Sequence, residues 1–311
     1  MKLPERATKP TMYFIGVTTG KSSIIKIFPA WAKALNLGDI EIKGIDVEIH
    51  APAEEYRSIV RFIKEDPLSL GALVTTHKID MFNSCEDIFD YLDPYATTLG
   101  ELSSISKDGG KLIGHAKDPI TAGKAMEEFI PADYWTGNDK YACILGAGGS
   151  ALAIAVYLAQ EKWGNNVPRR IILVNRSAPR LAEAVKRLAN IRVPLSFHLC
   201  QNVSLNDRII SKMLMGSLVV NATGLGKDRP GSPLTDDCLF PENALVWEIN
   251  YRGSLEFMHQ AIAQKEKRNL TVEDGWSYFI YGWTEVISEV FHVELSDDIL
   301  DKCKAIAGNF R

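Results

Sequence analysis

Apolar residues along the chain follow two alternating patterns. Short runs rich in Val, Ile and aromatic residues, typical of buried strands, alternate with longer stretches whose apolar residues recur at helical spacing. In the first third of the chain the strand-like runs are 11–17, 40–49 and 71–76, and the helical stretches are 24–35, 52–65 and, a little later, 120–130. This alternation predicts a parallel α/β architecture.

A second α/β segment begins sharply at Tyr141. Its strand-like runs are 141–149, 169–177, 217–224 and 244–251, the first of which ends in a glycine turn, and its helical stretches are 150–163 and 178–191. Helical periodicity then returns at 278–291 and 299–308. A chain of 311 residues allows about two domains. We therefore expect one α/β domain formed by 1–122 and 277–311, and a Rossmann-type doubly wound domain formed by 123–276.

Composition narrows the set of partners and compartments. A net charge of −4 gives no general attraction to nucleic acid or to an anionic membrane, and no run approaches the ~20 apolar residues of a membrane span. The N-terminus lacks the apolar stretch of a secretory signal. The five cysteines are odd in number, lack a CxxC pair and are expected to be buried free thiols, which fits the reducing cytoplasm. Spacing of His and Cys does not suggest a metal site.

The glycine turn after the strand at 141–145 carries candidate chemistry. Gly146, Gly148 and Ala151 form a GxGxxA pattern between a buried strand and a helix, which is the context that gives the pattern meaning. Gly146 permits a tight turn, Gly148 lets the backbone approach a pyrophosphate, and Ala151 allows close helix–strand packing. The helix N-terminus then offers N–H groups to phosphates. The pattern predicts dinucleotide binding, against the alternative of a purely structural turn.

The end of the next strand bears on the choice between NAD and NADP. NAD enzymes usually place Asp or Glu there to bind the ribose 2′-hydroxyl. Here the strand ends in Asn175, Arg176 and Ser177, with Arg180 one turn later. Because guanidinium groups bind phosphate oxygens bidentately, this end favours the 2′-phosphate of NADP. The alternative is a solvated basic start of a helix.

Seven short segments occur in an order similar to that of the shikimate dehydrogenase family. They are VTTHK, LGELSS, IGHAKD, GAGGSA, NRSAPR, NATGLG and EINYRG, and the resemblance covers roughly Phe14 to Phe291. It implies an N-terminal substrate domain, a place in aromatic amino acid biosynthesis, and Lys78 and Asp118 at the positions of the family's catalytic lysine and aspartate. It also implies a set of NADP-binding residues: Gly146, Ala147, Gly148, Gly149, Ser150, Asn175, Arg176, Ser177, Arg180, Asn221, Thr223 and Gly226.

The implied catalytic pair is chemically reasonable in its own right. Hydride transfer between a carbinol carbon and nicotinamide requires a proton to leave or join the oxygen, and Lys78 with Asp118 has the groups to hold that oxygen and shuttle its proton. The alternative is a structural salt bridge or two solvated charges.

The sequence departs from the family mainly where the substrate binds. In the family's Ser-x-Ser motif Ser22 matches, but Ile24 replaces the second serine. The asparagine of Ala-Val-Asn-Thr is Ser103, and the glutamine of Gly-x-x-Met-Leu-x-x-Gln is Gly282. A buried partner left unpaired costs ~1–3 kcal/mol, so we expect shikimate to be a poor substrate. The candidate substrate contacts are Ser22, Lys21, Thr75, Ser103, Tyr251 and Tyr278.

Several nearby residues have weaker assignments. His77 and Lys117 are candidates for the pocket rim, with a solvated surface position as the alternative. Tyr281 and Trp283 are candidates for the pocket wall, with core packing as the alternative. Glu248, where the family has aspartate, is expected to shape the nicotinamide end together with Tyr251.

The sequence therefore predicts an NADP-dependent dehydrogenase acting on a small cyclic hydroxy or keto acid, as a monomer or homodimer. Quinate- or aminoshikimate-like specificity is one alternative. A catalytically silent nucleotide sensor is another, although a pure binding protein has no need of Lys78 and Asp118. A methyl- or acyltransferase does not explain the basic residues at 175–180.

Overall fold

The computed structural model describes residues 3–137, 139–227 and 229–311. The chain divides into two compact units, which are described separately: unit 1 comprises Met1–Lys117 and Ile280–Arg311, and unit 2 comprises Asp118–Phe279. The boundaries expected from the sequence were 122/123 and 276/277. The difference at the first boundary arises because helix α5 (Asp118–Glu127) packs on α6 (Gly149–Leu158) of unit 2. At Gly123 an added Cβ would lie only 2.1 Å from the Tyr157 ring.

Unit 1 contains a six-stranded sheet in the order β2-β1-β3-β5-β6-β4. Its strands are β1 (Thr11–Gly16), β2 (Glu41–Asp46), β3 (Ser69–Val74), β4 (Tyr91–Leu92), β5 (Ser104–Asp108) and β6 (Lys111–His115). Strands β2, β1 and β3 are parallel, whereas β5 runs antiparallel to both β3 and β6. The α/β architecture predicted from the sequence is confirmed, with one antiparallel strand, β5, that the sequence did not predict. The reason is a two-residue hairpin at Gly109 and Gly110, whose φ angles of 54° and 81° suit a type I′ turn.

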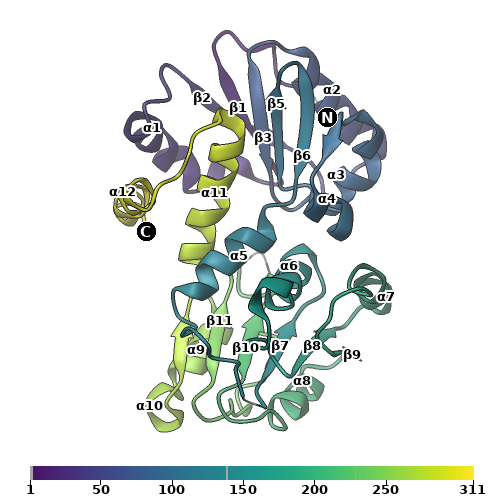
Figure 1. Cartoon of the computed structure of the whole chain (residues 1–311), viewed down its shortest axis with the longest axis vertical. Coiled ribbons are helices and arrows are strands. Elements are labelled where there is room, and N and C mark those ends of the chain that lie inside the picture. Colours follow the sequence, from purple (N-terminus) through teal and green to yellow (C-terminus); the bar gives the residue numbers. More distant parts are fainter. Residues whose placement is uncertain (1–2, 138, 228) are drawn as a thin grey trace. The chain divides into compact units, whose positions relative to one another are not determined.

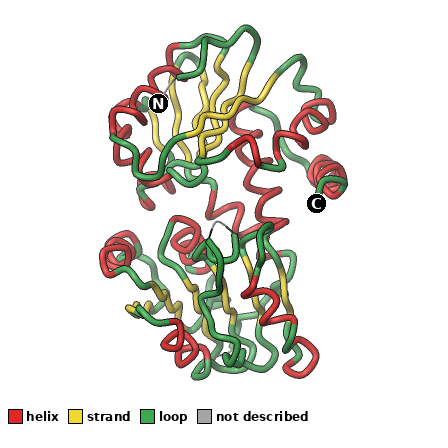
Figure 2. The backbone as a smooth tube through the Cα atoms, turned by 180° about the vertical axis from the view of Figure 1, so that it is seen from behind, coloured by secondary structure: helices red, strands yellow, loops and turns green. Residues whose placement is uncertain are grey.

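Helices lie on both sides of the unit 1 sheet (Figures 1 and 2). They are α1 (Ile24–Ala34), α2 (Ala53–Glu65), α3 (Lys78–Cys85), α4 (Pro94–Leu99), most of α11 (Trp276–Phe291) and α12 (Asp297–Gly308). The C-terminal helix is tied to the first helix because the buried Trp31 indole donates to the Cys303 carbonyl over 2.9 Å. Trp283 on α11 packs edge-on against Phe14 of β1, with ring centroids 4.8 Å apart. Trp283 and Tyr281 are both buried, which agrees with core packing.

Unit 2 contains a parallel six-stranded sheet in the order β12-β11-β10-β7-β8-β9. Its strands are β7 (Tyr141–Leu145), β8 (Arg170–Asn175), β9 (Leu195–Leu199), β10 (Leu218–Asn221), β11 (Leu245–Glu248) and β12 (Thr271–Glu273). This is the doubly wound order, and the direction of winding reverses between β7 and β10. The predicted Rossmann-type fold is confirmed.

The helices of unit 2 precede its first strand or connect later strands. They are α5, α6, α7 (Ala178–Arg187), α8 (Val203–Ile210), α9 (Glu256–Ile262) and α10 (Lys265–Arg268). All residues of α6 from Ala151 to Leu158 are buried, so this helix is part of the core. It ends at Leu158, five residues earlier than the pattern predicts. The five cysteines are buried and free, as expected.

No helix in the described ranges is long and apolar enough to cross a membrane. Within those same ranges no group of three or more His, Cys, Asp or Glu side chains is arranged to hold a metal ion.

Candidate functional site

The glycine turn lies at the carboxyl end of β7, where the direction of winding reverses. Gly146 has a φ of 135°, and its N–H donates to Val174 O over 2.7 Å. An added Cβ here would lie 2.4 Å from Ala222 O, so only glycine fits between the two strand ends. At Gly148, by contrast, an added Cβ would meet nothing within 4 Å. The turn therefore leaves open space in front of the α6 N-terminus, which fits a dinucleotide pyrophosphate.

The end of β8 presents two exposed guanidinium groups, those of Arg176 and Arg180. The intervening backbone is fixed by local hydrogen bonds. Asn175 Oδ1 accepts from Ser177 N over 2.9 Å, and Ser177 caps α7 by accepting from Arg180 N. Because the side chains of Asn175 and Ser177 hold the turn, the arginine side chains remain exposed at the strand end, where a 2′-phosphate can be bound.

A buried polar network joins the ends of β10 and β11. Asn221 Nδ2 donates to Glu248 Oε2 over 2.6 Å, while Asn250 donates to Glu248 Oε1 from both its backbone N–H and its side chain. Asn221 Oδ1 in turn accepts from the N–H and hydroxyl of Thr223. Burial raises the pKa of Glu248 to about 7, although these hydrogen bonds oppose the rise. The network fixes the loop that contains Thr223 and Gly226 beside the glycine turn.

The raised pKa of Glu248 predicts a pH-dependent stability. In the folded protein the carboxyl keeps its proton up to pH about 7, whereas in the unfolded chain it loses it near 4.5. The folded state therefore binds more protons in this window, and stability falls as pH rises through it. Replacing Glu248 by Gln removes this titration. Relative to wild type, the unfolding free energy of Glu248→Gln should rise by about 3 kcal/mol between pH 4.5 and 7.5 in urea titrations. Parallel pH curves for the two proteins would contradict this.

A second set of polar contacts involves Asp118, the first residue of α5. Asp118 is 5% exposed, and its Oδ2 lies 3.1 Å from Tyr278 Oη. The same phenol oxygen lies 3.2 Å from Ser150 Oγ at the start of α6. Three residues from separate parts of the sequence thus meet within unit 2. All three are candidates from the sequence, but their mutual contact could not be predicted because no sequence pattern connects them.

Lys78 belongs to unit 1, where it begins α3 immediately after the carboxyl end of β3. Its backbone N–H donates to Thr75 O over 3.2 Å, and its carbonyl accepts from Leu102 N over 3.0 Å. The side chains of Lys78 and Thr75 are half-buried. Ser22 is also half-buried, whereas Lys21 is exposed on a 3₁₀ turn. Strand β3, the short turn and α3 thus fix the backbone at these unit 1 candidates.

Ser103 is buried, and its hydroxyl is engaged within the protein. Its Oγ accepts from Lys117 N over 2.6 Å and lies 3.4 Å from His115 O. For Lys117 the alternative of a solvated surface position is wrong, because its ammonium is buried in an ion pair with Glu289. Glu289 also lies 3.4 Å from His115 Nε2. Burying the lysine is feasible because an opposite charge meets it.

His77 is likewise buried, so the alternative of a solvated surface position is wrong for it too. It is 1% exposed, and its Nδ1 lies 3.1 Å from Tyr56 Oη. Burial lowers the pKa of His77, so the neutral imidazole is favoured. Tyr251 is half-buried in an aromatic cluster in unit 2, with its ring centroid 4.3 Å from that of Phe279 and 5.7 Å from that of Trp276. Aromatic packing therefore holds the Tyr251 ring. A position near the nicotinamide end stays a prediction.

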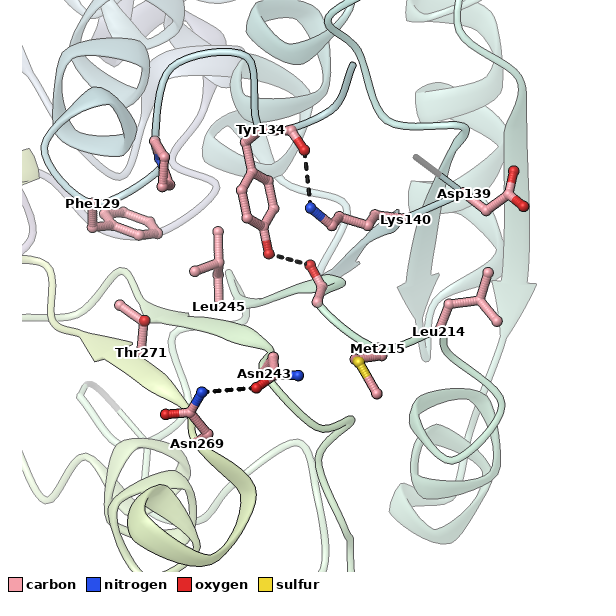
Figure 3. Close-up of a pocket in the computed structure, with 12 residues that line it drawn as sticks. Phe129, Tyr134, Asp139, Lys140, Leu214, Met215, Asn243, Leu245, Asn269 and Thr271 are labelled. Atoms are coloured by element: carbon pink, nitrogen blue, oxygen red, sulfur yellow. Dashed lines mark hydrogen bonds between the residues drawn. The ribbon is translucent and has the colours of Figure 1, made fainter. Parts of the chain in front are cut away.

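A cavity of about 690 Å³ lies elsewhere in unit 2 (Figure 3). Its lining includes Lys140, which precedes β7, and Leu245 and Thr271, the first residues of β11 and β12. The cavity is therefore at the amino ends of the parallel strands, whereas the glycine turn is at the carboxyl end of β7. Tyr134 crosses it and donates to Gly216 O over 2.6 Å. Dinucleotides bind at the carboxyl ends of strands in this topology, so this cavity is distinct from the candidate site.

Comparison with known proteins places the chain near one family, although no family model matches it. It is 28% identical over 177 residues to the shikimate dehydrogenase (NADP+) of Lactococcus lactis subsp. cremoris, covering 56% of this chain and 59% of that protein. The chain spans 55–62% of the length of the first curated relatives that it matches.

The similarity to solved structures extends over almost the full length of the chain. Shikimate 5-dehydrogenase from Listeria monocytogenes, in complex with shikimate and NAD, superimposes with a TM-score of 0.72 and 19% identity, covering 98% of this chain and 99% of that one. Quinate dehydrogenase from Corynebacterium glutamicum, in complex with NAD, has a TM-score of 0.70 and 17% identity, with 97% and 99% coverage. The resemblance predicted from the motifs is confirmed: the chain is related in sequence to the shikimate dehydrogenases and has their two-domain α/β fold.

Proposed function

We propose that this protein is an NADP(H)-dependent oxidoreductase that interconverts a small cyclic hydroxy acid and its keto form. The observation that carries this proposal is the glycine turn at the reversal of the unit 2 sheet, where Gly146 fits closely and the space in front of Gly148 is open. The sequence relatives, named NADP+-dependent shikimate dehydrogenases, support the same activity. They do not favour the alternative of a catalytically silent binding protein.

The preference for NADP rests on the end of β8. Arg176 and Arg180 are exposed there, and the strand end carries Asn175 instead of a carboxylate. A carboxylate would repel a 2′-phosphate, whereas guanidinium groups bind it. The proposed phosphate and nucleotide contacts are those of the glycine turn, the β8 end and the β10 loop: Gly146, Ala147, Gly148, Gly149, Ser150, Asn175, Arg176, Ser177, Arg180, Asn221, Thr223 and Gly226.

NADP(H) would accept or supply the hydride, and side chains of the protein would transfer the proton. We propose that Asp118 and Lys78 do so: the carboxylate accepts the proton of the substrate hydroxyl during oxidation, and the ammonium stabilises charge on that oxygen. The buried position of Asp118 suits this role, because water is largely excluded from its carboxylate.

For the substrate, unit 1 offers fewer polar contacts than the family motifs would supply. We propose Ser22, Lys21 and Thr75 as contacts from unit 1, and Tyr251 and Tyr278 from unit 2. Ser103 is the weakest of the predicted set, because its hydroxyl already bonds within the protein. We assign substrate binding to 1–122 and 277–311 and nucleotide binding to 123–276. A monomer or homodimer in the cytoplasm and a place in aromatic amino acid biosynthesis stay predictions.

The function is tested with a panel of cyclic hydroxy acids and both nicotinamide cofactors. We expect saturable NADPH binding by fluorescence, turnover of at least one panel member with NADP+ in preference to NAD+, and poor turnover of shikimate. The missing hydrogen-bond partners for shikimate are the physical reason, because each unpaired group costs ~1–3 kcal/mol. Tight NADPH binding without turnover of any cyclic acid would overturn the enzymatic proposal. Efficient shikimate oxidation would overturn the substrate prediction alone.

A further inference from the structure

Tyr278 occupies an unusual position for a residue of the substrate site. Its hydroxyl lies within hydrogen-bond distance of both Asp118 and Ser150, the first residue of α5 and a first-turn residue of α6. In the family motif Gly-x-x-Met-Leu-x-x-Gln, a methionine stands at this position. A thioether has no hydrogen to donate, so the contact is a feature of this chain's own sequence.

The direction of the two hydrogen bonds follows from the number of hydrogens that each group can donate. A phenol has one hydrogen, and an ionised carboxylate can only accept. Tyr278 therefore donates to Asp118 Oδ2 over 3.1 Å, and its oxygen accepts from the Ser150 hydroxyl over 3.2 Å. The phenol ring is held in turn by the buried Trp247, whose ring centroid is 5.7 Å away at an interplanar angle of 70°.

This arrangement restrains the Asp118 carboxylate at the first residue of α5. A hydrogen bond from a phenol to a charged acceptor is stronger than one to a neutral acceptor, so donation by Tyr278 holds the Asp118 carboxylate in one orientation. The Ser150 hydroxyl polarises the phenol further, because hydrogen bonds in series strengthen one another. All three residues lie in unit 2, so their geometry is set by one compact body.

We propose that Tyr278 is a positioning residue that orients the Asp118 carboxylate, and that it connects this group to the start of the nucleotide-binding helix through Ser150. The inference rests on the proposed function, in which Asp118 takes the proton. It adds a role for Tyr278 that differs from direct substrate contact.

The contact is first tested in the protein without substrate. In a sample with ¹³Cζ-labelled tyrosine, the Tyr278 resonance is identified by its loss in Tyr278→Phe. We expect it to shift in Asp118→Asn and to stay unchanged in Glu127→Gln. Tyr157 is the matched control, because it donates to Glu127 Oε1 over 2.6 Å in the same unit. Its resonance should behave in the opposite way. A Tyr278 resonance that is indifferent to Asp118→Asn would overturn the proposal.

The role is then tested by kinetics on Tyr278→Phe, with Tyr157→Phe as control. We expect kcat to fall about tenfold while KM for NADP+ changes less than about twofold, because orientation of the proton acceptor matters in the transition state. Tyr157→Phe should change neither quantity.

The role of Tyr278 and the proposed enzymatic function can be refuted separately. An unchanged kcat in Tyr278→Phe, in an enzyme that otherwise turns over, would refute the role of Tyr278. If wild type binds NADPH but turns over nothing, the proposed function fails, while the resonance experiment still decides whether the Tyr278–Asp118 bond exists. Unfolding midpoints of both phenylalanine variants show whether a loss of fold accounts for any change.

Discussion

Replacing Asp118 by asparagine is expected to lower kcat about a thousandfold, within the range that a general acid–base group supplies. The change is nearly isosteric and removes only the ability to take a proton. Tyr278 can still donate to the remaining oxygen, so the local structure should persist. Binding of NADPH, measured by fluorescence, should change less than about twofold, because asparagine removes a group used in the transition state and not in nucleotide binding.

Replacing Lys78 by methionine tests the second member of the proposed catalytic pair, which lies in unit 1. It keeps the aliphatic length but removes the ammonium, so kcat should again fall by about 10²–10⁴. The matched control is Asp80→Asn, a carboxylate in the first turn of the same helix that pairs with the exposed His50. It should leave kcat within about threefold, since an exposed ion pair contributes little. If Asp118→Asn and Lys78→Met both retain near-normal kcat, these residues are structural and the proposed catalytic pair is wrong.

The nucleotide-binding unit could be predicted well because its information is local. The buried strand, the glycine turn and the helix from Tyr141 to Leu158 are contiguous in sequence, and each part agrees with the next. The positive φ of Gly146 and the close approach of Ala222 O explain why the pattern demands glycine there. The right-handedness of strand–helix–strand crossovers then limits the possible orders of the strands.

Other features depended on partners far away in sequence. The antiparallel β5–β6 hairpin was missed, although Gly109 and Gly110 were a local signal for it. The short edge strands β9 and β12 carry few buried residues and so lack a clear apolar pattern. The ion pair of Lys117 with Glu289 joins residues 172 positions apart, and the contact of Asp118 with Tyr278 joins residues 160 apart. Sequence spacing cannot reveal such pairs; only tertiary packing does.

The second large effect is expected at Gly146. Substitution by alanine places a Cβ 2.4 Å from Ala222 O. It also forces alanine into a φ of 135°, which residues other than glycine rarely adopt. The strain and the clash together should lower the free energy of unfolding by about 2–4 kcal/mol, measured by urea titration, and NADPH binding should be lost with the turn geometry. The β10 backbone cannot move away easily, because Ala222 N is bonded to Leu145 O over 2.7 Å.

Gly148→Ala separates binding from folding at the same turn. Gly148 has an extended backbone, with φ −93° and ψ −176°, and its added Cβ meets nothing within 4 Å. Stability should therefore stay within about 0.5 kcal/mol of wild type. The methyl group nevertheless occupies the space in front of the α6 N-terminus, so NADPH affinity should fall at least about tenfold, because the phosphates can no longer approach the backbone. If Gly148→Ala binds NADPH as tightly as wild type, the phosphates do not pass over this residue, and the site proposed from the glycine turn is in the wrong place.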